Sequence, residues 1–172
     1  MDDRRGLIIV HTGDGKGKTT AALGLAIRAH GAGLNVLVLQ FIKGLRRSGE
    51  LNALDALGIE VRQLGLGFTS AGDINEHRAA ARLALDTARA EISSGAWDLI
   101  VLDEINYAVK FNLLTAADIT ALLTIRPPQV HLVFTGRDAP PQLINAADLV
   151  TEMKLVKHPF QRGIEAQAGI EF

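Results

Sequence analysis

Short apolar runs of strand length alternate with helical patterns along the whole chain, and no other feature of the sequence restricts the fold as strongly. Such alternation is typical of βαβ units and of a parallel sheet. Several runs are continuous stretches of β-branched residues and leucine, as in strands that helices cover on both faces. The predicted strands are residues 7–11, 36–40, 59–64, 99–102, 130–134 and 149–155. We therefore expect an α/β fold with a mostly parallel sheet and helices on both faces.

Helix start and stop signals divide the segments between these runs. A helical pattern over residues 20–30 ends at two glycines, Gly31 and Gly33, which commonly terminate helices. Asp73 is placed to cap a long helix. Thr115, with Asp118 three residues later, forms the sequence pattern of a capping box for a helix that begins at the next residue.

The length fits one domain. A chain of 172 residues that is 48% hydrophobic lies within the range of about 100–200 residues expected for a single domain. We therefore expect residues 1–172 to form one domain. Residues 161–172 carry no clear period, and we expect them to form a tail that a bound ligand could order.

Composition excludes several classes of site. The chain has no cysteine, which rules out disulfides, a cysteine nucleophile and thiolate-bound zinc or iron–sulfur centres. A net charge of −1 gives no basic field for nucleic acid. The apolar run near the N-terminus is too short for a secretion signal. No apolar run in the sequence approaches the roughly 20 residues of a membrane span. We expect a cytoplasmic protein that binds neither nucleic acid nor membrane.

The most informative segment is a buried strand that runs into a glycine-rich turn and then into a helix. Gly17, Lys18 and Thr19 stand where a phosphate-binding P-loop needs them. In such a loop the backbone N–H groups converge on an anion, the lysine adds a positive charge and the hydroxyl reaches Mg²⁺. The predicted phosphate-binding residues are Thr12, Gly13, Asp14, Gly15, Lys16, Gly17, Lys18, Thr19 and Thr20.

The loop departs from the usual P-loop pattern. That pattern places a glycine five positions before Gly17, where this chain has Thr12. The glycine comes one residue later, at Gly13, and the shortened loop also carries Lys16. The motif therefore predicts phosphate binding without predicting hydrolysis at the γ-phosphate. Together with the parallel sheet, it predicts a single domain of the P-loop (RecA-like) type.

Two carboxylates end the fourth predicted strand. Asp103 and Glu104 are placed to bind Mg²⁺ opposite Thr19, as acids at a strand end do beside a P-loop. A solvated acidic turn is the alternative. Arg137 follows the fifth strand and is predicted to reach the same crevice and contact phosphate; a surface salt bridge is the alternative for this residue.

Histidines and one aromatic residue are the remaining candidates. The five histidines show no metal-ligand spacing. The glycine-rich segment 65–72 presents Phe68, which either covers a ligand or packs beneath its own loop.

Together these motifs resemble the P-loop-type corrinoid (cob(I)alamin) adenosyltransferase family, nearly from end to end. The matching segments are residues 12–22, 40–44, 67–69, 101–104, 135–137, 156–158 and 166–170. The resemblance implies a homodimer that binds ATP and Mg²⁺ and transfers the 5′-deoxyadenosyl group to Co(I) of a reduced corrinoid, releasing triphosphate. It also implies that Phe68 contacts the lower face of the corrin. Ser70 stands where members usually have tryptophan.

This reaction would explain the lack of an evident nucleophile or acid–base set, because Co(I) is itself the nucleophile. Lys18, Glu104 and Arg137 would stabilise the departing triphosphate, and Thr19, Glu104 and Asp103 would hold Mg²⁺. Electrons would come from a separate donor, such as a reduced flavoprotein. Two alternatives stay open from the residues alone: an ATPase or small-molecule kinase acting at the γ-phosphate, and a nucleotide- or adenosylcobalamin-binding sensor without turnover.

Overall fold

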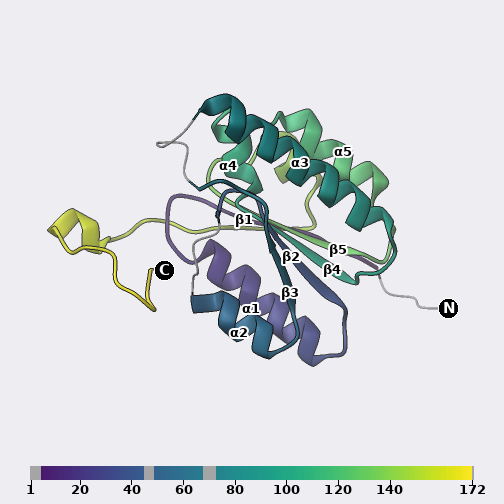
Figure 1. Cartoon of the computed structure of the whole chain (residues 1–172), viewed down its shortest axis with the longest axis horizontal. Coiled ribbons are helices and arrows are strands. Elements are labelled where there is room, and N and C mark those ends of the chain that lie inside the picture. Colours follow the sequence, from purple (N-terminus) through teal and green to yellow (C-terminus); the bar gives the residue numbers. More distant parts are fainter. Residues whose placement is uncertain (1–4, 45–48, 68–72, 172) are drawn as a thin grey trace.

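A six-stranded parallel sheet forms the centre of the molecule (Figure 1). The computed structural model describes residues 5–44, 49–67 and 73–171. The strand order is β3-β2-β4-β5-β1-β6. The strands are β1 (Ile8–Thr12), β2 (Val36–Gln40), β3 (Glu60–Gln63), β4 (Leu99–Asp103), β5 (His131–Thr135) and β6 (Leu149–Glu152). The predicted α/β fold is confirmed, and only β6 ends clearly earlier than predicted, at Glu152 instead of residue 155.

Helices cover both faces of the sheet, as expected (Figure 1). α1 (Lys18–Gly31) and α2 (Gly49–Ala56) lie on one face. α3 (Ile74–Ser93), α4 (Ile105–Lys110) and α5 (Ala116–Ile125) lie on the other, with α6 (Pro141–Ala146) packed beside α5. The helices α2, α4 and α6 were not predicted. No helix in the described ranges is long and apolar enough to cross a membrane.

The alternation of side chains along the strands builds two apolar layers. On β4, Leu99 and Val101 pack in the layer against α1, while Ile100 and Leu102 pack in the layer against α3 and α5. All four side chains are buried, and full burial of such a side chain contributes roughly 1.5–3 kcal/mol. The two layers hold the sheet in place between its helices, which fixes the positions of the strand ends.

The predicted helix caps are present. The Asp73 carboxylate accepts a hydrogen bond from the Asn75 backbone N–H at 2.9 Å at the start of α3. Thr115 and Asp118 form both hydrogen bonds of a capping box at the start of α5.

After β6 the chain leaves the sheet and runs through a short 3₁₀ helix, η1 (Pro159–Arg162), on one side of the molecule (Figure 1). Every residue from 160 to 170 is exposed. The ordering of residues 161–172 by a ligand stays a prediction.

Candidate functional site

The glycine-rich loop follows β1 directly and leads into α1. Gly13 and Gly17 have positive φ angles of 93° and 102°, a conformation that favours glycine over other residues. A Cβ atom on Gly15 would lie 2.7 Å from the carbonyl oxygen of Met153. The loop therefore needs glycine for its backbone path at Gly13 and Gly17, and for its close contact with the chain after β6 at Gly15.

Lys18 is folded back into this loop. Its Nζ donates hydrogen bonds to the carbonyl oxygens of Gly13 at 2.7 Å and Gly15 at 2.5 Å. Burial, and next the positive charge of Arg137, lower the pKa of Lys18. An ammonium group that is partly desolvated and near another cation interacts favourably with an anion, which suits this position to phosphate.

A row of polar side chains crosses the sheet near the carboxyl ends of its strands. The side chains from β1 to β5 lie on the face that α1 covers, because each has the same strand parity as the apolar residues packed against that helix. Thr151 of β6 joins the row as the register partner of His11. The row consists of Gln63, Gln40, Asp103, Thr135, His11 and Thr151, from β3 to β6. The row explains how residues far apart in the sequence reach one site: they occupy one register level of a parallel sheet.

Asp103 is the centre of this row. It is fully buried, and its Oδ1 accepts hydrogen bonds from the hydroxyl groups of Thr19 at 2.8 Å and Thr135 at 2.7 Å. Its Oδ2 accepts a third from Gln40 Nε2 at 3.2 Å. A buried carboxylate with three donors is held in one orientation, so Asp103 fixes the hydroxyl of Thr19 at the start of α1.

Glu104 lies beside Asp103 in a different environment. Its backbone adopts a left-handed conformation with φ of 62°, which is uncommon for a residue with a side chain. Its carboxyl oxygen Oε2 is buried and has no hydrogen-bond partner among the described residues. Burial, with the neighbouring Asp103 charge as the second cause, raises the pKa of Glu104 to about 7. Such an unpaired acid is suited to a cation.

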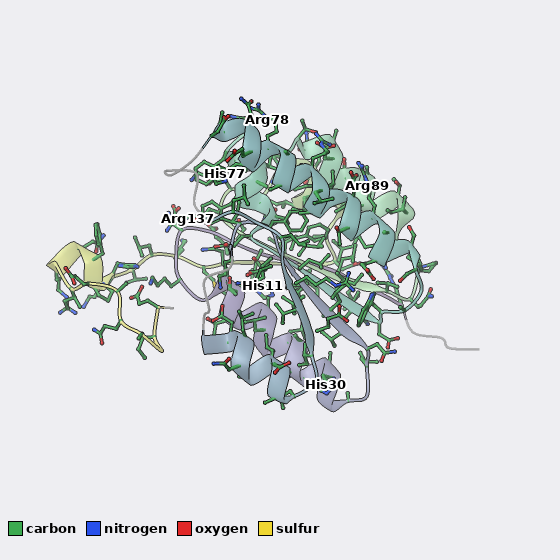
Figure 2. The ribbon with its side chains drawn as sticks, viewed as in Figure 1. His11, His30, His77, Arg78, Arg89 and Arg137 are labelled. Carbon is green, nitrogen blue, oxygen red and sulfur yellow. The ribbon has the colours of Figure 1, made fainter. Side chains whose placement is uncertain are left out.

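Arg137 and Asp14 face each other across the mouth of the site. Arg137 Nε lies 3.7 Å from Asp14 Oδ1, too long for a hydrogen bond, and Nε is buried without a hydrogen-bond partner among the described residues. Figure 2 shows Arg137 at the end of the sheet where the glycine-rich loop lies. An open pocket of about 470 Å³ adjoins both residues; its lining is Asp14, Arg137, Glu152, Lys154, Leu155 and Val156.

Lys43 adds a cation that the sequence-based candidate set did not include. Its Nζ donates to Glu50 Oε1 at 2.5 Å, and it is attracted by the charges of Asp103 and Glu104. Burial acts to lower the pKa of Lys43, but the hydrogen bond to Glu50 and these charges outweigh it, so the pKa is raised. In the sequence, only its place three residues after the end of β2 indicates that Lys43 lies near the site.

The structure brings most of the predicted residues together. The loop residues 13–17 and the first residues of α1 lie beside Asp103, Glu104 and Arg137. Thr12 differs, because its hydroxyl is buried and accepts a hydrogen bond from the Ala139 backbone N–H at 3.2 Å. Phe68 and Ser70 lie outside the described residues.

The donor set is compatible with Mg²⁺. Among the described residues, no group of three or more His, Asp or Glu side chains is arranged to hold a metal. Mg²⁺, however, is commonly bound through one or two carboxylates together with phosphate oxygens and water. Thr19, Asp103 and Glu104 offer a hydroxyl and two carboxylates at one place.

Comparison with known proteins gives consistent matches over almost the whole chain. The sequence profile of the family described as ATP:corrinoid adenosyltransferase BtuR/CobO/CobP matches residues 4–172. The chain is 40% identical over 171 residues to a corrinoid adenosyltransferase of Escherichia coli (strain K12), covering 99% of this chain and 87% of that protein. It is 43% identical over 173 residues to a corrinoid adenosyltransferase of Pseudomonas aeruginosa, covering 99% and 85%. A Salmonella typhimurium protein named corrinoid adenosyltransferase CobA is 40% identical over 171 residues, covering 99% and 87%.

Proposed function

The chain belongs to the ATP:corrinoid adenosyltransferase family, and from this premise we propose how its residues perform the reaction. It transfers the adenosyl group of ATP to a corrinoid. In the proposed step a bond forms between Co(I) of the reduced corrinoid and C5′ of ATP, the bond from C5′ to the triphosphate oxygen breaks, and triphosphate leaves with that electron pair. The observation that carries the proposal is the phosphate loop with Lys18 beside the Thr19–Asp103 hydrogen bond.

The residues near the loop stabilise the leaving group. Negative charge grows on the triphosphate as the bond to C5′ breaks, and fixed positive groups that face this charge lower the barrier. Lys18 and Arg137 supply such charges, and the N-terminal end of α1 adds its partial positive charge. The loop residues 13–17 hold the triphosphate so that C5′ is aligned with cobalt, which is a positioning task.

Three residues are proposed to hold Mg²⁺. Thr19 and Glu104 would bind the ion directly, since Glu104 Oε2 has no hydrogen-bond partner in the part of the chain that the structure describes. Asp103 would hold Thr19 in orientation, because both of its oxygens already accept hydrogen bonds. The ion, when bound, supplies positive charge to the triphosphate. Glu104 must be ionised for this role, and a nearby cation favours that form.

The corrinoid supplies the nucleophile, so no protein base is needed. We propose that Phe68, by family resemblance, contacts the lower face of the corrin. The chain contains no cysteine, and we propose that a separate donor, such as a reduced flavoprotein, supplies the electrons that produce Co(I). A homodimer in the cytoplasm, where ATP is available, completes the proposal.

The products of the reaction test the proposal. The full chain is incubated without oxygen with ATP, Mg²⁺ and chemically reduced cobalamin, and both corrinoid spectrum and phosphate products are followed. We expect triphosphate in equal amount to the alkylated corrinoid. Lys18→Ala should slow turnover by about 10²–10³-fold, the usual cost of removing one such stabilising group. ADP and phosphate without a cobalt–carbon bond would contradict the proposal and support a kinase or ATPase.

A further inference from the structure

The last described residue of the chain returns to the phosphate loop. Residues 160–170 are all exposed, but the Glu171 side chain is only 13% exposed. Its carboxylate forms an ion pair with Lys16, which lies in the loop between Gly15 and Gly17. Figure 1 shows the end of the chain turning back from η1 toward the body of the molecule. The tail is thus bound to the loop at its far end.

The same loop is bound to the beginning of this segment. The Gly15 backbone N–H donates to the Met153 carbonyl at 2.7 Å, and the Met153 N–H donates to the Thr12 carbonyl at 2.9 Å. One amide of the phosphate loop is therefore occupied by protein. The chain after β6 contacts the loop at two places, and the exposed stretch between them connects these contacts.

A carboxylate that pairs with a lysine of a phosphate loop lies where a phosphate oxygen would bind. Without nucleotide, Lys16 and Lys18 place two positive charges in one short loop. Lys18 donates to loop carbonyls, and Glu171 neutralises Lys16. We propose that Glu171 is an internal anion that competes with triphosphate for Lys16, so that ATP displaces the tail and the tail's return favours release of the triphosphate product. This inference rests on the proposed function, since it assigns a role in that reaction cycle.

A purely structural ion pair is the competing explanation. Partly exposed ion pairs contribute little to stability, and removing one would leave anion affinity unchanged apart from a general charge effect. Competition predicts instead that loss of the Glu171 charge tightens anion binding at the loop. The two explanations differ in a binding constant, which can be measured without any corrinoid.

The test is calorimetric titration of the full chain with inorganic triphosphate at constant ionic strength. For Glu171→Gln we expect binding about fivefold tighter, the effect of removing one partly screened competing charge. Glu165→Gln is the matched control, because it removes the same charge from an exposed position of the same tail; its affinity should stay within about twofold of the parent. Thermal unfolding of both variants checks that the fold is retained.

A double-mutant cycle locates the effect. In a Lys16→Gln background, Glu171→Gln is expected to change triphosphate affinity by less than about twofold, because the group for which it competes is gone. Equal affinities for Glu171→Gln and Glu165→Gln, or weaker binding by Glu171→Gln, would overturn the proposal. If Glu171→Gln binds triphosphate more tightly but the parent chain does not transfer the adenosyl group, the proposed function is refuted and the competition by Glu171 stands. The titration separates the two because it needs no cobalt–carbon bond.

Discussion

Stability conflicts with the proposed function at Glu104. Its pKa is raised to about 7, mainly by burial, so the folded state holds a proton that the unfolded chain loses near its ordinary pKa of 4.5. The stabilisation by this proton is complete below pH 4.5 and is lost as the pH rises through about 7. Ionised Glu104 therefore destabilises the metal-free fold.

We predict that Glu104→Gln raises the free energy of unfolding by about 2 kcal/mol near pH 8 and changes it little near pH 5, while turnover is lost. Urea unfolding at the two pH values, without nucleotide or metal, measures the effect. Glu152→Gln, an exposed acid at the end of β6, serves as the control. If Glu104→Gln changed the free energy of unfolding equally at both pH values, ionisation of the Glu104 carboxyl would not destabilise the fold.

His11 is a second residue with buried polar atoms that form no hydrogen bond within the described residues. It is buried on the face of the sheet that α1 covers (Figure 2). Neither ring nitrogen has a hydrogen-bond partner among the described residues. Burial lowers the pKa of His11. Neutral His11 therefore contributes stability above the pKa of 6.5 that it has in the unfolded chain. This contribution is lost as the pH falls through its lower pKa in the folded state.

We predict that His11→Phe stabilises the fold by about 1 kcal/mol at neutral pH, because a buried unpaired polar group is removed. The gain should increase as the pH falls below about 6.5. Chemical unfolding between about pH 5.5 and 7.5 tests this, with the half-buried His30 of α1 changed to Gln as a control. A constant gain toward acid pH would mean that folding does not lower the pKa of His11, and a decreasing gain would mean that a partner stabilises its charged form.

Helix α5 begins with an N-terminal cap on which its stability depends. The Thr115 hydroxyl accepts a hydrogen bond from the Asp118 backbone N–H at 3.1 Å, and the Asp118 carboxylate accepts one from the Thr115 N–H at 2.9 Å. We predict that Thr115→Ala lowers the free energy of unfolding by about 1 kcal/mol. Thr120→Ala, inside the same helix, should have no cost, since alanine is the better helix former. Equal losses would assign the effect to threonine packing instead of the cap.

The elements that the sequence predicted are those with a strong local signal. β2 and β4 are continuous apolar runs, and α3 and α5 begin at capping residues. α4 and α6 have six residues each and no side-chain cap, so their sequences carry little helical signal. β6 was predicted too long because Met153 forms hydrogen bonds with Thr12 and with Gly15 of the glycine-rich loop, and the strand ends although apolar residues continue.

The proximity of the motif residues in the candidate site could be predicted from the sequence, but the hydrogen-bond network that joins them could not. Lys18, Thr19 and Asp103 follow from a loop and a strand end. The hydrogen bonds from Gln40 and Thr135 to Asp103 depend on the relative register of three strands, which tertiary packing sets. The Glu171 contact joins residues separated by almost the entire chain. No local pattern in the sequence encodes such a pairing.

Exposed apolar side chains are concentrated in the segment after β6. Of the fifteen large apolar side chains that are exposed in the described residues, seven lie between Leu149 and Ile170. Three of these, Val156, Phe160 and Ile170, are at least 80% exposed. Apolar surface concentrated in one segment is typical of a contact with another molecule. For the proposed homodimer, we therefore expect the segment after β6 to contribute to the interface.

Sedimentation equilibrium should give a mass of twice the 18.4 kDa of the chain. Val156→Asp should weaken the dimer by at least about tenfold, because a buried unpaired charge in an interface is costly. Leu83→Asp is the matched control: Leu83 is 67% exposed on α3, on a different part of the molecule, and its replacement should leave the dimer intact. A parent chain that stays at 18.4 kDa at every concentration would contradict the homodimer. Equal weakening by the two substitutions would contradict the assigned surface, because the charge alone would then account for the loss.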